Sequence, residues 1–583
     1  MKTKFTCFLL GVLMAFSTVL TGCAKKESST EDIAGASARD TKTLVVYLMA
    51  EKEVPTATEI AIEEAINKLT KSKYKTQLDL RYYTAEEYYT KLEATIKAKK
   101  KELKEIEKKK NQQKKYQKWL KESCRVAGIS YIPETTKAPN TEATPEPTVV
   151  NQEYGIIEYW YPEARENQVD IFYLGGYDKY NEYLDNEWLA YLKEEVNTSS
   201  KKLTEHIGAI YMDNVQADGM YCIPNNALVG EYTWMLLDKT LMEKYFFSES
   251  SISESLANEN LYNFLYDVYK FERDDSGNLT TLPIKGSLEP TNVYYWTLDE
   301  ETLSLTNQRS VLGNVYGRNA KKGDPIAALN IFAVSGYTSQ VRMIKRFEMD
   351  GFFGTSADQD KPFAMTVVKG GYDVYTANKD KYYVKMLACP RADYDDLYKH
   401  MLCVNDLENN VARSMEIITY LNTDATVRNL LQYGIEGENY YVDDSGVLHR
   451  YNDTYMMDVN KTGNVFMAHP EEGKPSNYWK AGVQQNEDAR VLPVVGFKLE
   501  ADAAVDTKHL QAAQNLADAY FARMDACKTL EELDEFFAAA KSELAANPDV
   551  KFSINTSDSG ENEQSVSKFY WDWLVANGYV KLT

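Results

Sequence analysis

The sequence lacks the motifs by which most hydrolases, metalloenzymes and nucleotide-binding enzymes can be recognised. Its histidines stand alone, so neither H-x-x-x-H nor H-E-x-x-H occurs. It also has no G-x-S-x-G turn, no Walker A loop and no G-x-G-x-x-G segment after a strand. We therefore expect a protein that is not an enzyme and that holds neither a metal ion nor a cofactor. The five histidines are His206, His400, His449, His469 and His509.

Cysteine is scarce, and no C-x-x-C pair is present. This excludes a disulfide framework, and it leaves zinc-ribbon and redox interpretations without support. Apart from Cys7 and Cys23, an odd number of cysteines remains, so at least one thiol must be free. Cys389 and Cys403 could pair around a short loop, and the sequence leaves that question open. The remaining cysteines are Cys124, Cys222, Cys389, Cys403 and Cys527.

Long apolar runs are absent after the N-terminus. Residues 5–20 form an uncharged apolar run preceded by Lys2 and Lys4, and Leu20-Thr21-Gly22-Cys23 resembles the lipobox of bacterial lipoproteins. The resemblance implies a leader over 1–22, removed on export, and a lipidated Cys23. The alternative is an ordinary secretory leader with a chance cysteine. Residues 23–42 are small and charged and predict a flexible tether. We expect the body to be lipid-anchored on the extracytoplasmic face of the cell membrane.

Positive charge is in deficit, which bears on the choice of partner. The net charge is −21, and it becomes −23 once Lys2 and Lys4 leave with the leader. Such an acidic body repels nucleic acid, so no nucleic-acid partner is expected. Aromatic residues, in contrast, make up 12% of the chain and include 43 tyrosines. Tyrosine offers a flat apolar face and a hydroxyl group, which suit sugars or peptides, although it also serves ordinary packing.

The first part of the chain alternates strand and helix patterns. Residues 43–49 predict a strand, and a Thr56-x-x-Glu59 capping box predicts the start of a helix whose apolar face holds Ile62, Ile66 and Leu69. A strand over 77–83, a helix over 85–96 and a strand over 169–174 follow. This order is typical of an α/β layer with a parallel sheet.

An insertion over 97–168 interrupts that order. Residues 97–125 carry 13 Lys or Arg against 4 Glu, a net charge of +9 that leaves −32 on the rest of the mature chain. Residues 131–149 contain four prolines and five threonines and predict an extended or disordered loop. The basic helix either touches anionic lipid or a wall polymer, or is a solvated helical insertion, and we favour the solvated insertion.

Later segments give weaker signals. DDSG at 274–277 and at 443–446 predicts hairpin turns rather than calcium loops. Helices are expected near 408–421 and near 424–433, the second ending at Gly434. Residues 507–577 are mostly helical in pattern, with a capping box at Thr529 and Glu532 and with Leu533, Phe537 and Leu544 facing inward. A mature length of 561 residues is too long for one core and predicts two lobes.

Several segments together resemble the extracellular solute-binding proteins of ABC importers. The opening strands, ADGMYCIP at 217–224, EYTWMLLDKTLMEKY at 231–245 and KPFAMTVVKGGYDVY at 361–375 carry this resemblance. Residues 415–447 and 463–473 resemble a lipoprotein subgroup that contains the DUF3502 region. The resemblance implies an α/β clamshell of the type II periplasmic-binding-protein kind, with a helical insertion and a helical C-terminal region.

The resemblance also implies a division of the chain. It places 43–230 in the first lobe, 231–388 in the second, 389–455 in a return to the first lobe, and 456–583 in the second lobe and the C-terminal helices. Ligands of open α/β sheets bind beyond the carboxyl ends of the strands. For each candidate residue, a purely structural role is the alternative. The rule and the family positions predict ligand contacts at Met49, Ala50, Glu51, Tyr83, Tyr173, Gly175, Gly176, Tyr232, Trp234, Tyr372, Tyr433 and Glu436.

The resemblance implies a monomer that captures a small solute, preferably a carbohydrate, and passes it to ABC permease subunits. Three alternatives remain open from the sequence. The same clamshell could serve a membrane sensor, the protein could bind a wall polymer or a membrane partner at the cell surface, or it could act on glycans.

Overall fold

The computed structural model describes most of the chain, but not its N-terminus. The leader 1–22, Cys23, nearly all of the tether 23–42 and the Thr/Pro-rich segment 131–149 lie outside the described residues. The described residues are 40–128, 165–199, 201–212, 214–215, 219–299, 303–315, 328–408, 410–491, 497, 499, 506–554 and 565–576.

The first lobe is built on a five-stranded sheet with the order β2-β1-β3-β15-β4. β1 pairs in parallel with β2 and β3, whereas β15 is antiparallel to both β3 and β4. β15, which comes late in the chain, thus lies between the early strands β3 and β4. This arrangement is expected when the chain returns to the first lobe after forming the second. The strands are β1 (Lys42–Ala50), β2 (Thr76–Thr84), β3 (Ile171–Leu174), β4 (Ile223–Pro224) and β15 (Met401–Val404).

Helices cover the first sheet because its central strands are apolar on both faces. Every residue of β1 from Leu44 onward is buried, as expected of a parallel strand between helical layers. α2 (Thr56–Tyr74) presents Ile62 and Ile66 to this core. The predicted capping box at Thr56 is wrong. Pro55 is the N-cap residue, and its carbonyl accepts from the backbone N–H groups of Thr58 and Glu59, so Thr56 is already helical.

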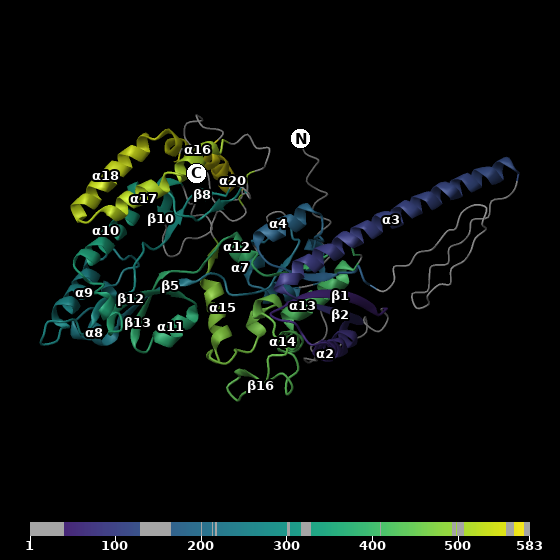
Figure 1. Ribbon diagram of the computed structural model, residues 1–583, viewed down its shortest axis with the longest axis horizontal. Helices are drawn as coiled ribbons and strands as arrows, with labels where there is room; N and C mark the ends of the chain where they lie inside the picture. Colours follow the sequence, from purple (N-terminus) through teal and green to yellow (C-terminus); the bar gives the residue numbers. More distant parts are fainter. Residues whose placement is uncertain are drawn as a thin grey trace, which may run out of the picture.

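The second lobe has a separate four-stranded sheet with the order β13-β5-β12-β6. Its core packs the sheet against α9 (Glu259–Phe271) and α10 (Ser335–Met349). Figure 1 shows this body apart from the one that holds β1 and β2. Two sheets with their own buried clusters confirm the predicted two-lobed α/β fold. The strands are β5 (Tyr232–Asp238), β6 (Leu282–Lys285), β12 (Phe363–Gly370) and β13 (Tyr382–Ala388).

The C-terminal helices form a further layer, at the top left of Figure 1. They pack around Phe332, whose ring lies 5.3 Å from that of Phe521 and 5.2 Å from that of Phe536. The predicted capping box of Thr529 and Glu532 is present, and Leu533, Phe537 and Leu544 are buried. The elements are β7 (Val293–Tyr295), β10 (Leu312–Val315), β11 (Leu329–Asn330), α16 (Lys508–Gln514), α17 (Ala517–Ala526), α18 (Leu530–Ala546), α19 (Pro548–Ile554) and α20 (Val566–Ala576).

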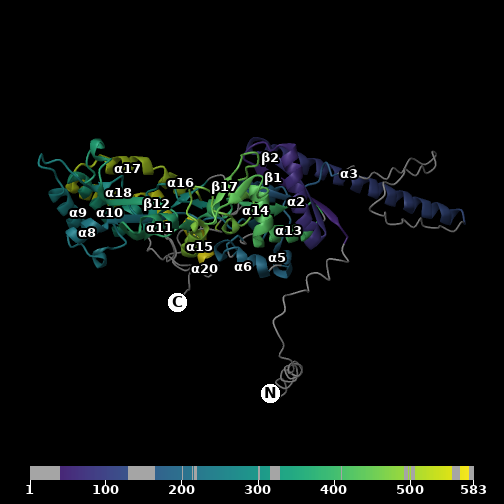
Figure 2. The ribbon, with the colours of Figure 1, turned by 90° about the horizontal axis from the view of Figure 1, so that it is seen from below.

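α3 (Ala85–Val126) is a single helix of 42 residues, about 63 Å long at 1.5 Å per residue. It joins the predicted helix over 85–96 to the predicted basic helix without a break. Its first half packs on the first sheet through Tyr88, Leu92 and Ile96, and its second half projects away from the body in both views (Figures 1 and 2).

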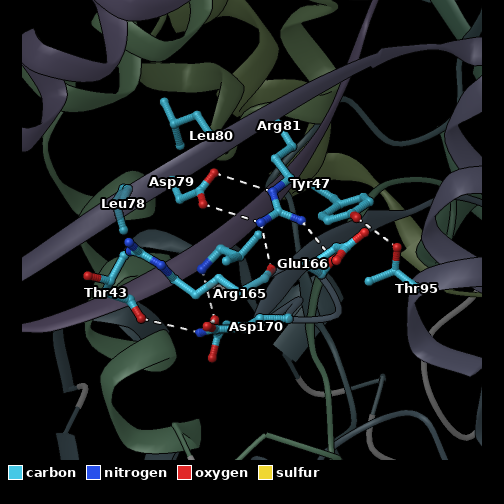
Figure 3. Close-up of polar contacts among 12 residues, drawn as sticks. Thr43, Tyr47, Leu78, Asp79, Leu80, Arg81, Thr95, Arg165, Glu166 and Asp170 are labelled. Atoms are coloured by element: carbon cyan, nitrogen blue, oxygen red, sulfur yellow. Dashed lines mark hydrogen bonds and ion pairs between the residues drawn. The ribbon is translucent and has the colours of Figure 1, made fainter. Parts of the chain in front are cut away.

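The chain that returns from the insertion is fastened to the first sheet (Figure 3). The guanidinium of Arg81 on β2 donates to the backbone carbonyls of Arg165 (2.7 Å) and Glu166 (3.3 Å), and Asp79 holds it from the other side. Asp170 then accepts from the backbone N–H of Val45 at 2.8 Å. The base of the insertion is therefore part of the rigid lobe.

The segment after β15 returns to the first lobe before a helix leads on to the second. α13 (Val411–Thr423) and α14 (Ala425–Tyr433) are the two predicted helices, and Gly434 ends the second with a φ of 84°. The DDSG at 443–446 forms the turn between β16 (Tyr440–Val442) and β17 (Leu448–Arg450), as predicted. α15 (Tyr478–Asp488) then lies between the lobes (Figure 1).

The remaining elements are short. Among the described residues, no disulfide joins Cys124, Cys222, Cys389, Cys403 or Cys527, so Cys389 and Cys403 form no disulfide with each other. The elements are α4 (Tyr177–Asp185), α5 (Lys193–Ser199), α6 (Lys201–His206), α7 (Ala209–Met212), α8 (Lys239–Lys244), α11 (Tyr372–Asn378), α12 (Tyr394–Leu397), β8 (Thr297–Leu298), β9 (Leu305–Thr306), β14 (Arg391–Ala392) and β18 (Arg490–Val491), with 3-10 turns at Glu249–Ser251, Ile331–Ala333, Ser356–Asp358, Val459–Lys461 and Val465–Met467.

Candidate ligand site

The carboxyl ends of β1, β2 and β3 meet at one edge of the first sheet, because these strands are parallel. Glu51 follows β1 there, and its backbone N–H donates to the carbonyl of Met456 at 2.9 Å. Its carboxylate accepts from Nζ of Lys461 at 3.1 Å, and Lys461 also lies 3.7 Å from Asp458. At this edge one lysine is therefore shared by two carboxylates. The segment around 456–461, which the predicted boundary assigns to the second lobe, lies against the first sheet.

Tyr173 at the end of β3 makes the second polar contact of this edge. Its hydroxyl lies 2.8 Å from Nδ1 of His400, just before β15. Burial lowers the pKa of His400 to about 4, and burial also raises the pKa of Tyr173. Both groups are therefore neutral at physiological pH, and the pair offers hydrogen-bonding atoms without charge.

Gly175 and Gly176 are required by the backbone. A Cβ at Gly175 would lie 2.5 Å from the Tyr173 hydroxyl and 3.1 Å from the carbonyl of Lys399. Gly176 has a φ of 96°, a left-handed conformation that favours glycine, and it is the N-cap residue of α4. The Gly175 N–H donates to the hydroxyl of Tyr89 at 3.2 Å. These contacts account for both glycines without a ligand, so their role in binding stays a prediction.

The other predicted residue of this edge, Tyr83, points toward α3. Its ring lies 5.2 Å from that of Tyr47, whose hydroxyl is 2.9 Å from Oγ1 of Thr95 on α3. Burial, followed by the neighbouring Tyr47, raises the pKa of Tyr83 to about 12. Met49 and Ala50 are buried in the strand. The structure thus brings Glu51 and Tyr173 to the polar edge, but directs Tyr83 toward the covered face of the sheet.

The second lobe contributes a cluster of four aromatic rings, which we call the ring cluster: Tyr232, Trp234, Tyr372 and Tyr375. Tyr232 and Trp234 on β5 stack at 4.3 Å, and Trp234 lies 6.3 Å from Tyr372 and 5.9 Å from Tyr375. Tyr232 and Trp234 are buried, whereas the two tyrosines of α11 are partly exposed. The sequence predicted three of the four rings. Tyr375 was missed, although it follows Tyr372 by one turn of helix.

Polar atoms fix the two buried rings of the cluster. The Tyr232 hydroxyl donates to Asp488 at 2.8 Å, and Nε1 of Trp234 donates to the carbonyl of Gly371 at 3.1 Å. Because these groups are occupied, the ring cluster presents mainly the flat faces and hydroxyls of Tyr372 and Tyr375. Such a surface can stack on an apolar face and hydrogen-bond to a hydroxyl at its margin.

The two remaining predicted residues lie in the segment after α14. Tyr433 is fully buried, its hydroxyl donates to the carbonyl of His469 at 2.8 Å, and its ring packs near that of Tyr440 at 5.7 Å. Glu436 is exposed on the turn that follows. The structure gives Tyr433 a packing role, and a ligand contact for either residue stays a prediction.

The joint between the lobes is held by α15. Gln485 donates to the carbonyl of Gly230 at 2.6 Å, and its Oε1 accepts from the backbone N–H of Tyr372 at 3.2 Å. Gly230 has a φ of 56°, and a Cβ there would lie 2.5 Å from the carbonyl of Arg391. Gly230, where the chain leaves the first lobe, therefore lies against Arg391, where the chain returns to it.

A cavity of about 730 Å³ lies beside this joint. Its wall includes His206 and Ile210 from the first lobe, Phe466, Asn486 near the end of α15, and Arg490 at the start of β18. Its size is within the range of small-molecule sites. None of the residues predicted to bind the ligand lines it, so the cavity is distinct from the polar edge and from the ring cluster.

Signs of other chemistry are few in the described part of the chain. Within it, no group of three or more His, Cys, Asp and Glu side chains is arranged to hold a metal ion. Among the described helices, none combines the length and the apolar composition needed to cross a bilayer. The sequence patterns did not mark His400, Asp458 or Lys461 as site residues. A position next to the returning strand was the only signal that could have marked His400.

Comparisons with known proteins give matches among solved structures only at low sequence identity. No family model and no curated protein matches the chain. Among solved structures, an N-glycan transport solute binding protein from Streptococcus pneumoniae is 14% identical, with a TM-score of 0.49 over 92% of this chain and 100% of that one. An extracellular solute-binding protein from Bifidobacterium longum subsp. infantis is 11% identical (TM-score 0.44, covering 93% and 99%). An HMO-binding, ABC-transporter-associated solute binding protein from Bifidobacterium longum infantis is 10% identical (TM-score 0.42, covering 93% and 100%).

Proposed function

We propose that this chain captures a carbohydrate between its two lobes and delivers it to the permease subunits of an ABC importer. The ring cluster is the observation that carries the proposal. Two partly exposed tyrosines stand on a stacked tyrosine–tryptophan pair, at the lobe face tied to the joint by Gln485. Aromatic faces suit the apolar faces of sugar rings, and the tyrosine hydroxyls suit sugar hydroxyls.

The polar edge of the first lobe favours a neutral ligand over an anionic one. Lys461 is shared by the carboxylates of Glu51 and Asp458, and Tyr173 and His400 are uncharged. An anionic ligand would need an unpaired cationic group in a partly buried place, because burial of an unpaired charge is costly. A sugar needs only donors and acceptors, which this edge supplies.

Two lobes joined by crossing segments also suit capture by closure. A ligand that contacts both lobes binds the closed state better than the open one, and so shifts the population toward closure. The closed form then presents a surface that differs from that of the empty protein. In this proposal, the permease subunits recognise that surface.

The test uses the mature chain with Cys23→Ser, so that it stays free of lipid. A thermal-shift screen with neutral mono- and oligosaccharides, and with short peptides as the competing class, comes first. A ligand that binds only the folded state, at 100 times its Kd, adds about 2.7 kcal/mol of stability. Calorimetry then measures the Kd of the best sugar.

Removal of an exposed ring of the cluster should weaken sugar binding. We expect Tyr372→Ala and Tyr375→Ala each to raise the Kd at least tenfold, because each removes a stacking face. The control is Tyr441→Ala, an exposed tyrosine (40% exposed) that stacks on His449 of the β16–β17 hairpin. A shift to peptide ligands, or an equal loss in all three variants, would contradict the proposal.

Membrane anchoring through Cys23 belongs to the same proposal. It predicts that palmitate label appears on the wild-type chain and not on the Cys23→Ser variant. The monomeric state, the domain boundaries and membership of the DUF3502-containing subgroup stay predictions. A sensor role for the same clamshell remains the alternative. Loss of the permease subunits, if it left the response to the ligand intact, would favour that alternative.

A further inference from the structure

α3 runs antiparallel to the strands that it covers and continues past the far edge of the sheet. Tyr88 near its start donates to the carbonyl of Tyr173, at the carboxyl end of β3. Further along, Lys99 pairs with Glu408 at 3.2 Å, just after β15 ends, and Glu102 accepts from Asn167, just before β3 begins. Residues 99–102 thus lie at the amino edge of the parallel strands, opposite the ligand edge.

Beyond that edge the helix is basic and exposed. We call Glu107–Val126 the basic arm. It holds eight Lys or Arg against two Glu, a net charge of +6 in a chain of net charge −21. Trp119 is 52% exposed and stacks on Tyr116 at 5.9 Å, and Val126 is 77% exposed. Most of a helix's stability in a protein comes from packing, and this half packs little on the described body.

The chain leaves the first sheet toward Cys23 at the same edge. Lys42, the first residue of β1, donates from its Nζ to Asn410, which lies near Glu408 in the chain. The arm reaches about 36 Å past Glu102 at 1.5 Å per residue. The 19 peptide links from Cys23 to Lys42 can span at most about 65 Å. The tether is therefore long enough for the arm and the lipid of Cys23 to reach the same surface.

We propose that the basic arm docks on the anionic surface of the bilayer that holds the lipid of Cys23. Charge complementarity supports this partner, because basic side chains next to an anionic bilayer each gain attraction within a Debye length. Tryptophan and tyrosine at the arm suit the interface between water and lipid. A bilayer is favoured over a wall polymer, since the tether keeps the arm within reach of the membrane itself.

The consequence is an oriented protein. The rest of the mature chain carries −32 with 97–125 set aside, and an anionic bilayer repels it. Contact is thus confined to the arm. The ligand edge, at the other end of the packed half of α3, stays clear of the lipid. The proposal rests on the lipid anchor for its geometry, but its test does not use the anchor.

The experiment measures vesicle binding of the mature chain with Cys23→Ser by co-sedimentation. The vesicles are phosphatidylglycerol and phosphatidylcholine in equal parts, or phosphatidylcholine alone, at 0.1 M and at 1 M NaCl. We expect at least tenfold tighter binding to the anionic vesicles at 0.1 M NaCl, and release at 1 M, where the Debye length falls to about 3 Å. Equal binding to both kinds of vesicle would overturn the proposal.

Matched variants locate the contact. The arm variant, in which four arm lysines become glutamine, should bind anionic vesicles at least tenfold more weakly, and helix content should persist because the two residue types have similar helix propensity. A body variant with the same change in charge should bind as the wild type does. The arm variant carries Lys108, Lys114, Lys115 and Lys118→Gln, and the body variant carries Lys270, Lys379, Lys528 and Lys541→Gln.

Two further outcomes would overturn the proposal. One is an equal loss in both variants, which would mean that net charge and not the arm sets binding. The other is arm-dependent binding to poly(glycerol phosphate) without binding to vesicles, which would assign the arm to a wall polymer. Sugar affinity, measured on the same arm variant, should be unchanged. Failure of vesicle binding is therefore distinct from failure of the proposed sugar capture.

Discussion

At the scale of single residues, the candidate site holds Lys461 between two carboxylates and keeps Tyr173 and His400 uncharged. His400 is held neutral by burial, beside the hydroxyl of Tyr173. The nearby Lys461 also disfavours a protonated imidazole, although Asp458 opposes it. The neutral imidazole of His400 can accept a hydrogen bond from the Tyr173 hydroxyl through one nitrogen and donate a hydrogen bond through the other. The pair can therefore both donate to and accept from a hydroxyl group of a ligand.

This pair makes stability depend on pH. Below pH 6.5 the unfolded chain protonates His400, while the folded protein resists protonation until about pH 4. The unfolding free energy therefore falls as the pH drops through this window. Between pH 7 and pH 5, the loss from this residue should be about 2 kcal/mol. Urea denaturation at both pH values should show a smaller loss for His400→Gln than for the wild type. Equal losses would mean that His400 is not buried as a neutral group.

Single site residues could be predicted where they directly follow the end of a strand. They could not be predicted where their place in the site depends on partners that are distant in the sequence. Glu51 and Tyr173 lie where the ends of apolar strands indicated. His400 meets Tyr173 across 227 residues, and Lys461 meets Glu51 across 410. No local pattern encodes such contacts, because they arise only once the sheet is assembled. Tyr433 was predicted to contact the ligand because of its family position, but its ring is packed in a hydrophobic core.

At the scale of elements, α3 is one continuous helix with a buried first half and an exposed second half. Its first half is amphipathic and buried through Tyr88, Leu92 and Ile96, whereas the basic arm has no comparable seam. The sequence predicted both parts, but as separate elements, because their compositions differ. The failed capping box of α2 has a similar cause. Thr56 and Glu59 have the spacing of a capping box, but Pro55 is the N-cap residue. The helix therefore begins one residue earlier than the box requires.

The two halves of α3 should respond differently to truncation of one aliphatic side chain. Ile96→Ala leaves a cavity under the sheet and should lower the unfolding free energy by about 2–5 kcal/mol. Val126→Ala, at the exposed tip, should change it by less than about 0.5 kcal/mol. Denaturant titration of both variants measures the difference. A large loss at Val126 would show that the tip packs on the body.

At the scale of the whole molecule, the order of segments was more predictable than their packing. The resemblance over 217–245 and 361–375 predicted two lobes, and the two sheets agree. The association of the C-terminal helices with β7, β10 and β11 could not be predicted, because these strands have two to four residues each and carry too little periodicity. Phe332, at the centre of that layer, is 189 residues from Phe521 and 204 residues from Phe536, which pack against it.

The union of the lobes should depend on Gln485. Its side chain is 2% exposed and bonds to the crossing segment at Gly230 and to Tyr372 of the second lobe. Gln485→Ala leaves these buried backbone groups without partners, at a cost of about 1–3 kcal/mol for each unsatisfied group. Scanning calorimetry should show a lower Tm and a wider separation of lobe transitions than in the control Val483→Ala, an exposed neighbour on α15. An unchanged profile would place the coupling elsewhere.

The position of β15 has a consequence for the order in which the molecule forms. Its four residues sit between β3 and β4, yet they are synthesised after every strand of the second sheet. The second sheet is contained within a continuous stretch of chain and can therefore assemble while the first still has an open edge. Closing the long loop from β3 to β15 carries a large entropic cost, which slows completion of the first lobe. Until then, β3 presents an unpaired edge, which is the form most vulnerable to aggregation and to proteolysis.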